Sequence, residues 1–132
     1  MKRISRLRRE MIIDSNFLID ILNNDSNAVK KLEELKERKE PLLLAPGVLY
    51  ELYSGTESEK EITRIENELN QAELTPAIEK EAARIRKKLT AEGKPISSID
   101  YLIAGTARHL NEKILTRDEH FKRIEELKVE EF

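Results

Sequence analysis

The segment that most constrains the fold is a short apolar run that ends in an acid and leads directly into a helical pattern. Residues 11–13 are Met-Ile-Ile, Asp14 ends the predicted strand, and a helix begins at Ser15 or Asn16. A short apolar run joined directly to a helix is typical of a buried strand in a parallel sheet. Ligands of such sheets bind outside the carboxyl ends of the strands, so Asp14 is the first candidate for a functional carboxylate.

Short apolar runs and helical patterns alternate along the rest of the chain. Further strands are predicted at residues 42–45, 72–74, 113–116 and 129–132. The helix that begins at Ser15 or Asn16 extends to residue 22, and further helices are predicted at residues 28–40, 46–53, 62–69, 76–91, 97–110 and 118–124. Thr75 and Ser97 are predicted N-caps, and the 97–110 helix has an apolar stripe of Ile99, Leu102, Ile103, Ala107 and Leu110. This alternation predicts one α/β domain around a mainly parallel sheet.

The ends and the size of the chain suggest a simple organisation. With 132 residues, the chain is the size of one ordinary domain. Residues 1–10 hold five basic residues and little that could pack, so we expect a disordered basic extension before a domain at 11–132; a basic arm that touches RNA is the alternative. No apolar run approaches the ~18 residues of a membrane span, and we expect a cytoplasmic protein without a membrane partner.

The composition limits the chemistry that the chain can perform. There is no cysteine, which excludes disulfides and thiolate metal sites, so a divalent ion would need oxygen ligands, as Mg²⁺ and Mn²⁺ prefer. Lys and Arg (24) nearly balance Asp and Glu (26), so any binding of nucleic acid must rest on local patches.

Three further acids, Glu51, Asp100 and Asp118, lie in apolar settings similar to that of Asp14. Three of the four acids have an ordinary explanation. Asp14 and Asp118 fit helix N-caps, and Asp100 fits a capping arrangement that begins at Ser97. Glu51 is harder to explain in this way, because it falls inside an apolar helix where an ionised carboxylate is costly to bury.

The four acids together favour a metal site. Asp14 and Asp118 end strands, while Glu51 and Asp100 lie in the first turns that follow a strand or a cap. If the strands are neighbours, the four carboxylates repel one another at one edge of the sheet, and a hard divalent cation is the usual resolution. A cation held in this way can activate water and stabilise charge on a phosphate, which is the chemistry of a nuclease or phosphatase.

Four short segments in the same order and spacing resemble the PIN-domain nucleases, most closely the VapC-type toxins of toxin–antitoxin pairs. These segments are residues 13–19 (IDSNFLI), 48–52 (VLYEL) followed by Gly55, 99–107 (IDYLIAGTA) and 115–121 (LTRDEHF). The resemblance covers residues 11–132. It implies a three-layer fold with a five-stranded parallel sheet, and an RNA endonuclease in which Asp14, Glu51, Asp100 and Asp118 surround one or two Mg²⁺ or Mn²⁺ ions.

The resemblance also implies supporting residues and partners. Asn16 and Thr116 would orient a carboxylate or a water. Members of the family usually form homodimers and are silenced by a cognate antitoxin whose tail occupies the cleft. Arg117 is a candidate contact for a substrate phosphate, and His120 a candidate proton donor, although exposed positions at a strand end are more often simply solvated.

Other functions remain open from the sequence. An aspartate-based phosphotransferase is disfavoured, because it needs a second Asp where this chain has Asn16. Two alternatives to a toxin nuclease remain. One is a non-catalytic PIN-like module that binds RNA or a protein, and the other is a housekeeping RNA-processing nuclease. All four acids are present as acids, which argues against a degenerate site.

Overall fold

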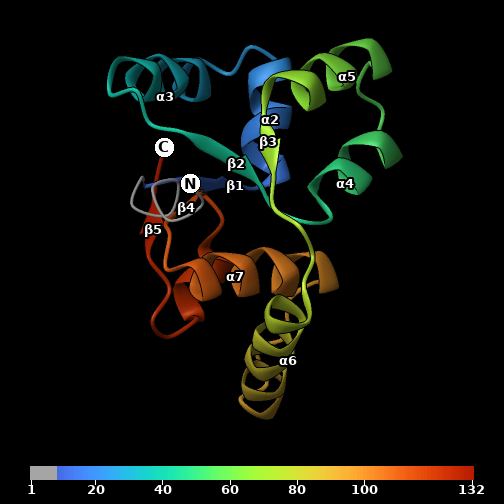
Figure 1. The fold of residues 1–132 in the computed structure, drawn as a ribbon, viewed down its shortest axis with the longest axis vertical. Helices are drawn as coiled ribbons and strands as arrows, with labels where there is room; N and C mark the ends of the chain where they lie inside the picture. Colours follow the sequence, from blue (N-terminus) through green and yellow to red (C-terminus); the bar gives the residue numbers. More distant parts are fainter. Residues whose placement is uncertain (1–8) are drawn as a thin grey trace, which may run out of the picture.

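A computed structural model describes residues 9–132, which form a five-stranded parallel sheet covered by helices (Figure 1). The strand order is β3-β2-β1-β4-β5. The strands are β1 (Met11–Ile13), β2 (Leu42–Leu44), β3 (Asn70–Gln71), β4 (Ile114–Leu115) and β5 (Val129–Glu130). The helices are α2 (Ser15–Leu22), α3 (Ser26–Glu37), α4 (Val48–Ser54), α5 (Glu59–Glu68), α6 (Pro76–Ala91), α7 (Ser98–Leu110) and the 3₁₀ helix η1 (Glu119–Arg123).

The sheet separates two layers of helices, as the α/β prediction requires. In Figure 1, α2 and α3 lie on one side of the sheet, and α7 with α6 lies on the other. The central strand β1 pairs in parallel with β2 and with β4, so that Ile13 is level with Leu44 on one side and with Leu115 on the other. These three side chains are fully buried. The predicted three-layer, five-stranded fold is therefore confirmed.

The predicted helix starts are confirmed where a capping side chain marks them. Asp14 is the N-cap of α2, Thr75 of α6 and Ser97 of α7, and each side chain accepts a hydrogen bond from a backbone N–H of the first turn. Strand β1 ends at Ile13, one residue earlier than predicted, because Asp14 already serves as the cap.

Several predicted boundaries are wrong; for example, the helices predicted at residues 28–40 and 62–69 span Ser26–Glu37 and Glu59–Glu68. The helix predicted at residues 46–53 begins at Val48, because Pro46 and Gly47 form a turn in which Gly47 has a φ of +94°. A side chain is strained at this φ, and a Cβ on Gly47 would also meet Ile99 at 2.8 Å. The later start places Glu51 in the first turn of α4. The edge strand predicted at residues 72–74 lies at 70–71, where Asn70 pairs with Leu43.

Helices α6 and α7 pack closely against each other on the second face of the sheet. The buried face of α7 differs from the predicted stripe: Ile99 and Leu102 are partly exposed and Leu110 is exposed, whereas a continuous group from Ile103 to Ala107 is buried. A Cβ on Gly105 would lie 2.8 Å from the backbone nitrogen of Ala82. The absence of a side chain at Gly105 therefore allows the two helices to approach.

The basic extension predicted at residues 1–10 lies largely outside the described residues, which begin at Arg9. The backbone N–H of Glu10 donates to Glu112 Oε2 at 2.8 Å, and Arg9 lies 3.8 Å from the same carboxylate. Among residues 9–132, no helix is long and apolar enough to cross a membrane.

Candidate functional site

The site is built where three adjacent parallel strands end. Asp14 follows β1, Thr116 follows β4, and the turn after β2 leads into α4 with Glu51. Because the strands are parallel, these three positions share one edge of the sheet. Asp118 follows β4 by three residues, and Asp100 lies in the first turn of α7.

Asp14 is fixed on both carboxylate oxygens. Its Oδ1 accepts a hydrogen bond from the Phe17 N–H at 3.0 Å, and its Oδ2 accepts one from the Thr116 hydroxyl at 2.5 Å. The pKa of Asp14 is raised to about 6, mainly by burial and also by the charges of Asp100 and Asp118, while the two hydrogen bonds oppose the rise. Thr116 therefore holds one oxygen of this carboxylate in place.

Asp100 and Asp118 lie close together, with His120 beside them. One ligand atom from each of the three side chains lies within 4.8 Å of the other two. Burial raises the pKa of Asp100, the charges of Asp118 and Glu51 raise it further, and hydrogen bonding with Ser97 and the nearby His120 oppose the rise. The charges of Asp100, Asp118 and Glu51 therefore each act on another member of the quartet, and Asp14 feels two of them.

Glu51 is held at the site by Ser15, which was not among the predicted site residues. The Ser15 hydroxyl donates to Glu51 Oε1 at 2.7 Å and ties the start of α2 to the first turn of α4. Ser15 is buried, although it follows directly after Asp14 at a helix start where exposed polar residues are common. Its burial and its position next to Asp14 could have identified it only once the sheet order was known.

The two remaining candidates lie at the edge of the cluster. Asn16 is exposed at the start of α2. Arg117 interacts with other residues of the protein. Its Nη2 donates to Asp25 Oδ2 at 2.7 Å, and its guanidinium stacks over the ring of the C-terminal Phe132 at 4.2 Å from the centroid. A contact between Arg117 and a substrate would have to compete with these two interactions.

The donor set fits a hard divalent cation. Ligands that share one ion at about 2.1–2.6 Å lie within about 5 Å of one another, and the cluster of Asp100, Asp118 and His120 meets that limit. Asp14 is placed by Thr116 and Glu51 by Ser15. Burial is the main cause of the raised pKa of both Asp14 and Asp100, and the repulsion from neighbouring carboxylates that adds to it is the kind that a bound cation relieves.

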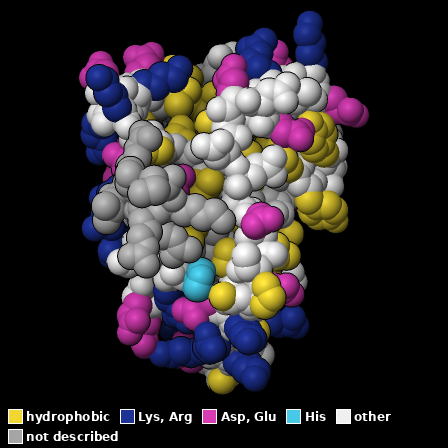
Figure 2. Space-filling view, in the orientation of Figure 1, with side chains coloured by type: hydrophobic (Ala, Val, Ile, Leu, Met, Phe, Trp, Pro, Cys, Tyr) yellow, Lys and Arg dark blue, Asp and Glu magenta, His cyan; other side chains and the backbone are white. Residues whose placement is uncertain are grey.

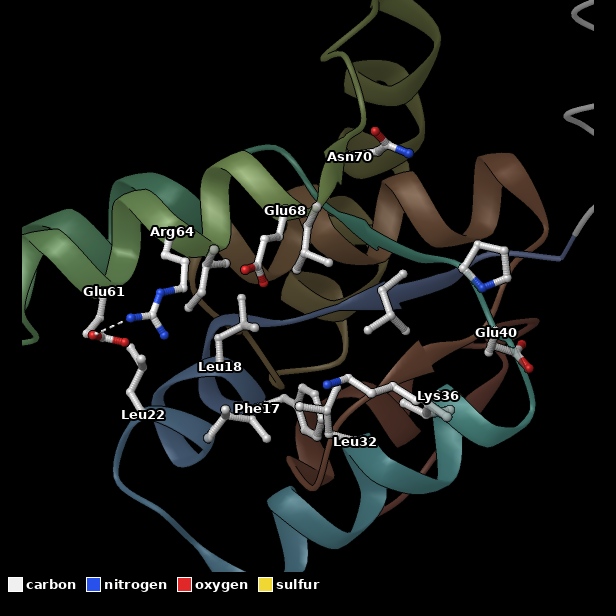
Figure 3. A pocket seen from close by; sticks show the side chains of 16 residues that line it. Phe17, Leu18, Leu22, Leu32, Lys36, Glu40, Glu61, Arg64, Glu68 and Asn70 are labelled. Carbon is white, nitrogen blue, oxygen red and sulfur yellow. Dashed lines mark hydrogen bonds and ion pairs between the residues drawn. The ribbon is translucent and has the colours of Figure 1, made fainter.

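A separate apolar groove of about 490 Å³ lies between α2, α3, α5 and β2 (Figure 3). Apolar side chains including Leu18, Leu22 and Leu32 line it, and charged side chains of both signs, such as Lys36 and Glu68, stand at its sides. The groove is built by the first helical layer, so it belongs to a different surface from the helix pair α6 and α7.

Basic side chains gather at the end of the molecule that α6 forms (Figure 2). Arg84, Arg86, Lys87 and Lys88 on this helix are all exposed. Arg84 pairs with Glu81 at 2.9 Å and Lys88 with Glu125 at 2.6 Å. Two of these four basic side chains therefore form local ion pairs on a solvent-exposed helix face.

Comparison with known proteins identifies the family. The model of the PIN domain family matches residues 11–127. VapBC2 from Rickettsia felis, bound to a DNA fragment from their promoter, matches with a TM-score of 0.77 and 20% identity over 93% of this chain and 98% of that chain. VapBC-1 from nontypeable Haemophilus influenzae matches with a TM-score of 0.77 and 20% identity over 92% of this chain and 97% of that chain. FitAcB from Neisseria gonorrhoeae matches with a TM-score of 0.67 and 18% identity over 90% of this chain and 95% of that chain. No match was found among curated proteins. The chain belongs to the PIN domain family.

Proposed function

We propose that this PIN domain is a metal-dependent endoribonuclease that hydrolyses RNA phosphodiesters. The observation that carries the proposal is the gathering of Asp14, Glu51, Asp100 and Asp118 at one edge of the sheet, where burial and mutual repulsion raise the pKa of two of them. Perturbed carboxylates in one site are typical of functional groups. Mg²⁺ or Mn²⁺ bound there would activate a water and stabilise charge on the scissile phosphate.

The side chains around the quartet position it for this task. Thr116 orients Asp14 through its hydroxyl, and the Asp118 N–H donates to the same hydroxyl oxygen at 3.0 Å. One threonine therefore links the Asp14 carboxylate to the backbone of Asp118. Ser15 orients Glu51 in the same way from the start of α2. Such groups fix the geometry of metal-binding carboxylates, and their loss typically lowers metal affinity or activity by about 10–100-fold.

Cleavage of an RNA panel tests the proposal. The protein, free of any inhibitor, should cut single-stranded or structured RNA with Mg²⁺ or Mn²⁺ and should stop when a chelator is added. Asp118→Asn should abolish cleavage, because it removes a carboxylate from the cluster. Glu119→Gln is the matched control, since the Glu119 side chain is exposed and pairs with Lys122 instead. Folded protein that cuts no RNA under any condition would favour the non-catalytic binding module.

We also propose a toxin role with an antitoxin protein as partner. The similar structures of VapBC-1 and FitAcB support it through the fold that they share with this chain. The apolar groove beside α2 and α3 is a surface that an antitoxin segment would cover. The product of a small neighbouring gene should then co-purify with the protein and inhibit it, and Leu32→Glu in the groove should prevent both effects.

A homodimer is the second assembly that we propose. Tyr50 on α4 is 68% exposed, and Tyr53 on the same helix is also exposed. Exposed aromatic side chains are common at protein interfaces. Light scattering should give twice the chain mass for the protein and a lower mass for Tyr50→Glu, and a monomer at all concentrations would contradict this assembly.

A further inference from the structure

The two histidines of the chain lie in different surroundings. His109 is exposed near the end of α7. His120 lies in η1, two residues after Asp118, and its Nδ1 is 3.1 Å from Asp118 Oδ1. Only His120 belongs to the group of ligand atoms that includes Asp100.

The backbone holds His120 in this position. Asp118 is the N-cap of η1, and its Oδ1 accepts a hydrogen bond from the His120 N–H at 2.9 Å. Phe121, the next residue, is fully buried and anchors the same short helix in the core. The backbone of His120 is therefore held beside the two carboxylates, although nearly half of the His120 side chain is exposed.

A ring nitrogen changes which ion a carboxylate site prefers. Carboxylates suit both Mg²⁺ and Mn²⁺, whereas imidazole binds first-row transition ions in preference to Mg²⁺. The exposure of His120 leaves the ring free to turn one nitrogen toward an ion between Asp100 and Asp118.

We propose that His120 is a nitrogen ligand of the ion held by Asp100 and Asp118, and that it makes this site favour Mn²⁺ and Co²⁺ over Mg²⁺. The inference rests on the proposed function, because it takes the carboxylate cluster as the metal site of the nuclease. It adds a ligand, and with it a metal preference, that the four carboxylates do not supply.

Binding of Mn²⁺ followed by electron paramagnetic resonance tests this ligand without any RNA. Pulsed spectra of the full-length protein with Mn²⁺ should show coupling to a ¹⁴N nucleus. His120→Ala should remove that coupling and weaken Mn²⁺ binding by about tenfold or more, while Mg²⁺ affinity, measured by competition, changes much less. His109→Ala is the matched control and should behave like the unchanged protein.

The outcomes separate this inference from the proposed function. Mn²⁺ binding with no ¹⁴N coupling, or a His120→Ala variant with unchanged preference for Mn²⁺ over Mg²⁺, would overturn the role of His120 and leave the carboxylate site standing. Absence of any Mn²⁺ binding by the unchanged protein would overturn both. Circular dichroism of His120→Ala should match that of the unchanged protein, because its backbone hydrogen bond to Asp118 does not depend on the side chain.

Discussion

Asp14→Asn is expected to make the folded protein more stable at neutral pH and at the same time to reduce RNA cleavage by about a thousandfold or more. The carboxylate is 3% exposed, and its pKa is raised to about 6 from 3.8, mainly by burial. That difference corresponds to about 3 kcal/mol of destabilisation by the charged form at neutral pH. Cleavage should fall because loss of a metal-binding carboxylate removes several kcal/mol of transition-state stabilisation.

The pH dependence follows from the sign of this shift. The folded state holds the Asp14 proton more tightly than the unfolded state, so ionisation of Asp14 destabilises the fold at any pH above about 6. This cost decreases as the pH falls through 6 and disappears below about 3.8. The advantage of Asp14→Asn, up to about 3 kcal/mol at pH 7.5, should therefore shrink toward zero near pH 4.

Urea unfolding with chelator present, at pH 7.5 and at pH 4.5, measures this effect. An Asn side chain can still accept the Phe17 N–H that Asp14 caps. Asp25→Asn is a suitable control, because Asp25 is also a helix N-cap but has a lowered pKa, owing to hydrogen bonds from the Ala28 N–H and Arg117. It should lose stability at pH 7.5. An Asp14→Asn protein that is less stable than the unchanged chain at that pH would show that the cap outweighs the buried charge.

Gly105→Val should be among the most destabilising single substitutions in the domain. A Cβ at this position would lie 2.8 Å from the Ala82 nitrogen, 2.9 Å from its Cβ and 3.0 Å from its Cα. Two of these atoms belong to the backbone of α6, so the clash cannot be relieved by a change of rotamer. Forced separation of α6 and α7 should cost about 3 kcal/mol or more.

Thermal or urea unfolding checks this prediction. Ala83→Val, on the exposed side of α6, changes helix propensity without a clash and should cost less than about 1 kcal/mol. Gly105→Ala is the stricter test, since the same exchange in an exposed helix would stabilise it by about 1 kcal/mol. A Gly105→Ala protein more stable than the unchanged chain would show that α6 and α7 can move apart easily.

The parts of the fold that local chemistry determines were predictable from the sequence. Residues 11–13 are apolar on both faces because the central strand is buried on both faces, and Thr75 and Ser97 mark helix starts through their side-chain oxygens. Asp14 was predictable at a strand end because it directly follows residues 11–13, whereas Asp118 lies three residues beyond β4 and caps η1. The convergence of these acids with Glu51 and Asp100 depends on strand order, which no local pattern contains.

Other features depend on contacts between distant residues. The buried face of α7 centres on Gly105 and its small neighbours, which a search for large apolar side chains overlooks. The hydrogen bond from Ser15 to Glu51 joins residues 36 positions apart. Arg117 is directed toward Asp25 and Phe132, a placement that only the folded C-terminus reveals.

The most direct test of the account is a crystal structure of the protein grown with Mn²⁺, with diffraction measured at the manganese absorption edge. We expect an anomalous peak between the carboxylates of Asp100 and Asp118, on the side of the sheet edge where Asp14 and Glu51 lie. The same crystals of Asp118→Asn should show a much weaker peak. An ordered site with no peak among these carboxylates, or a peak only elsewhere on the surface, would contradict a metal-dependent nuclease built on this quartet.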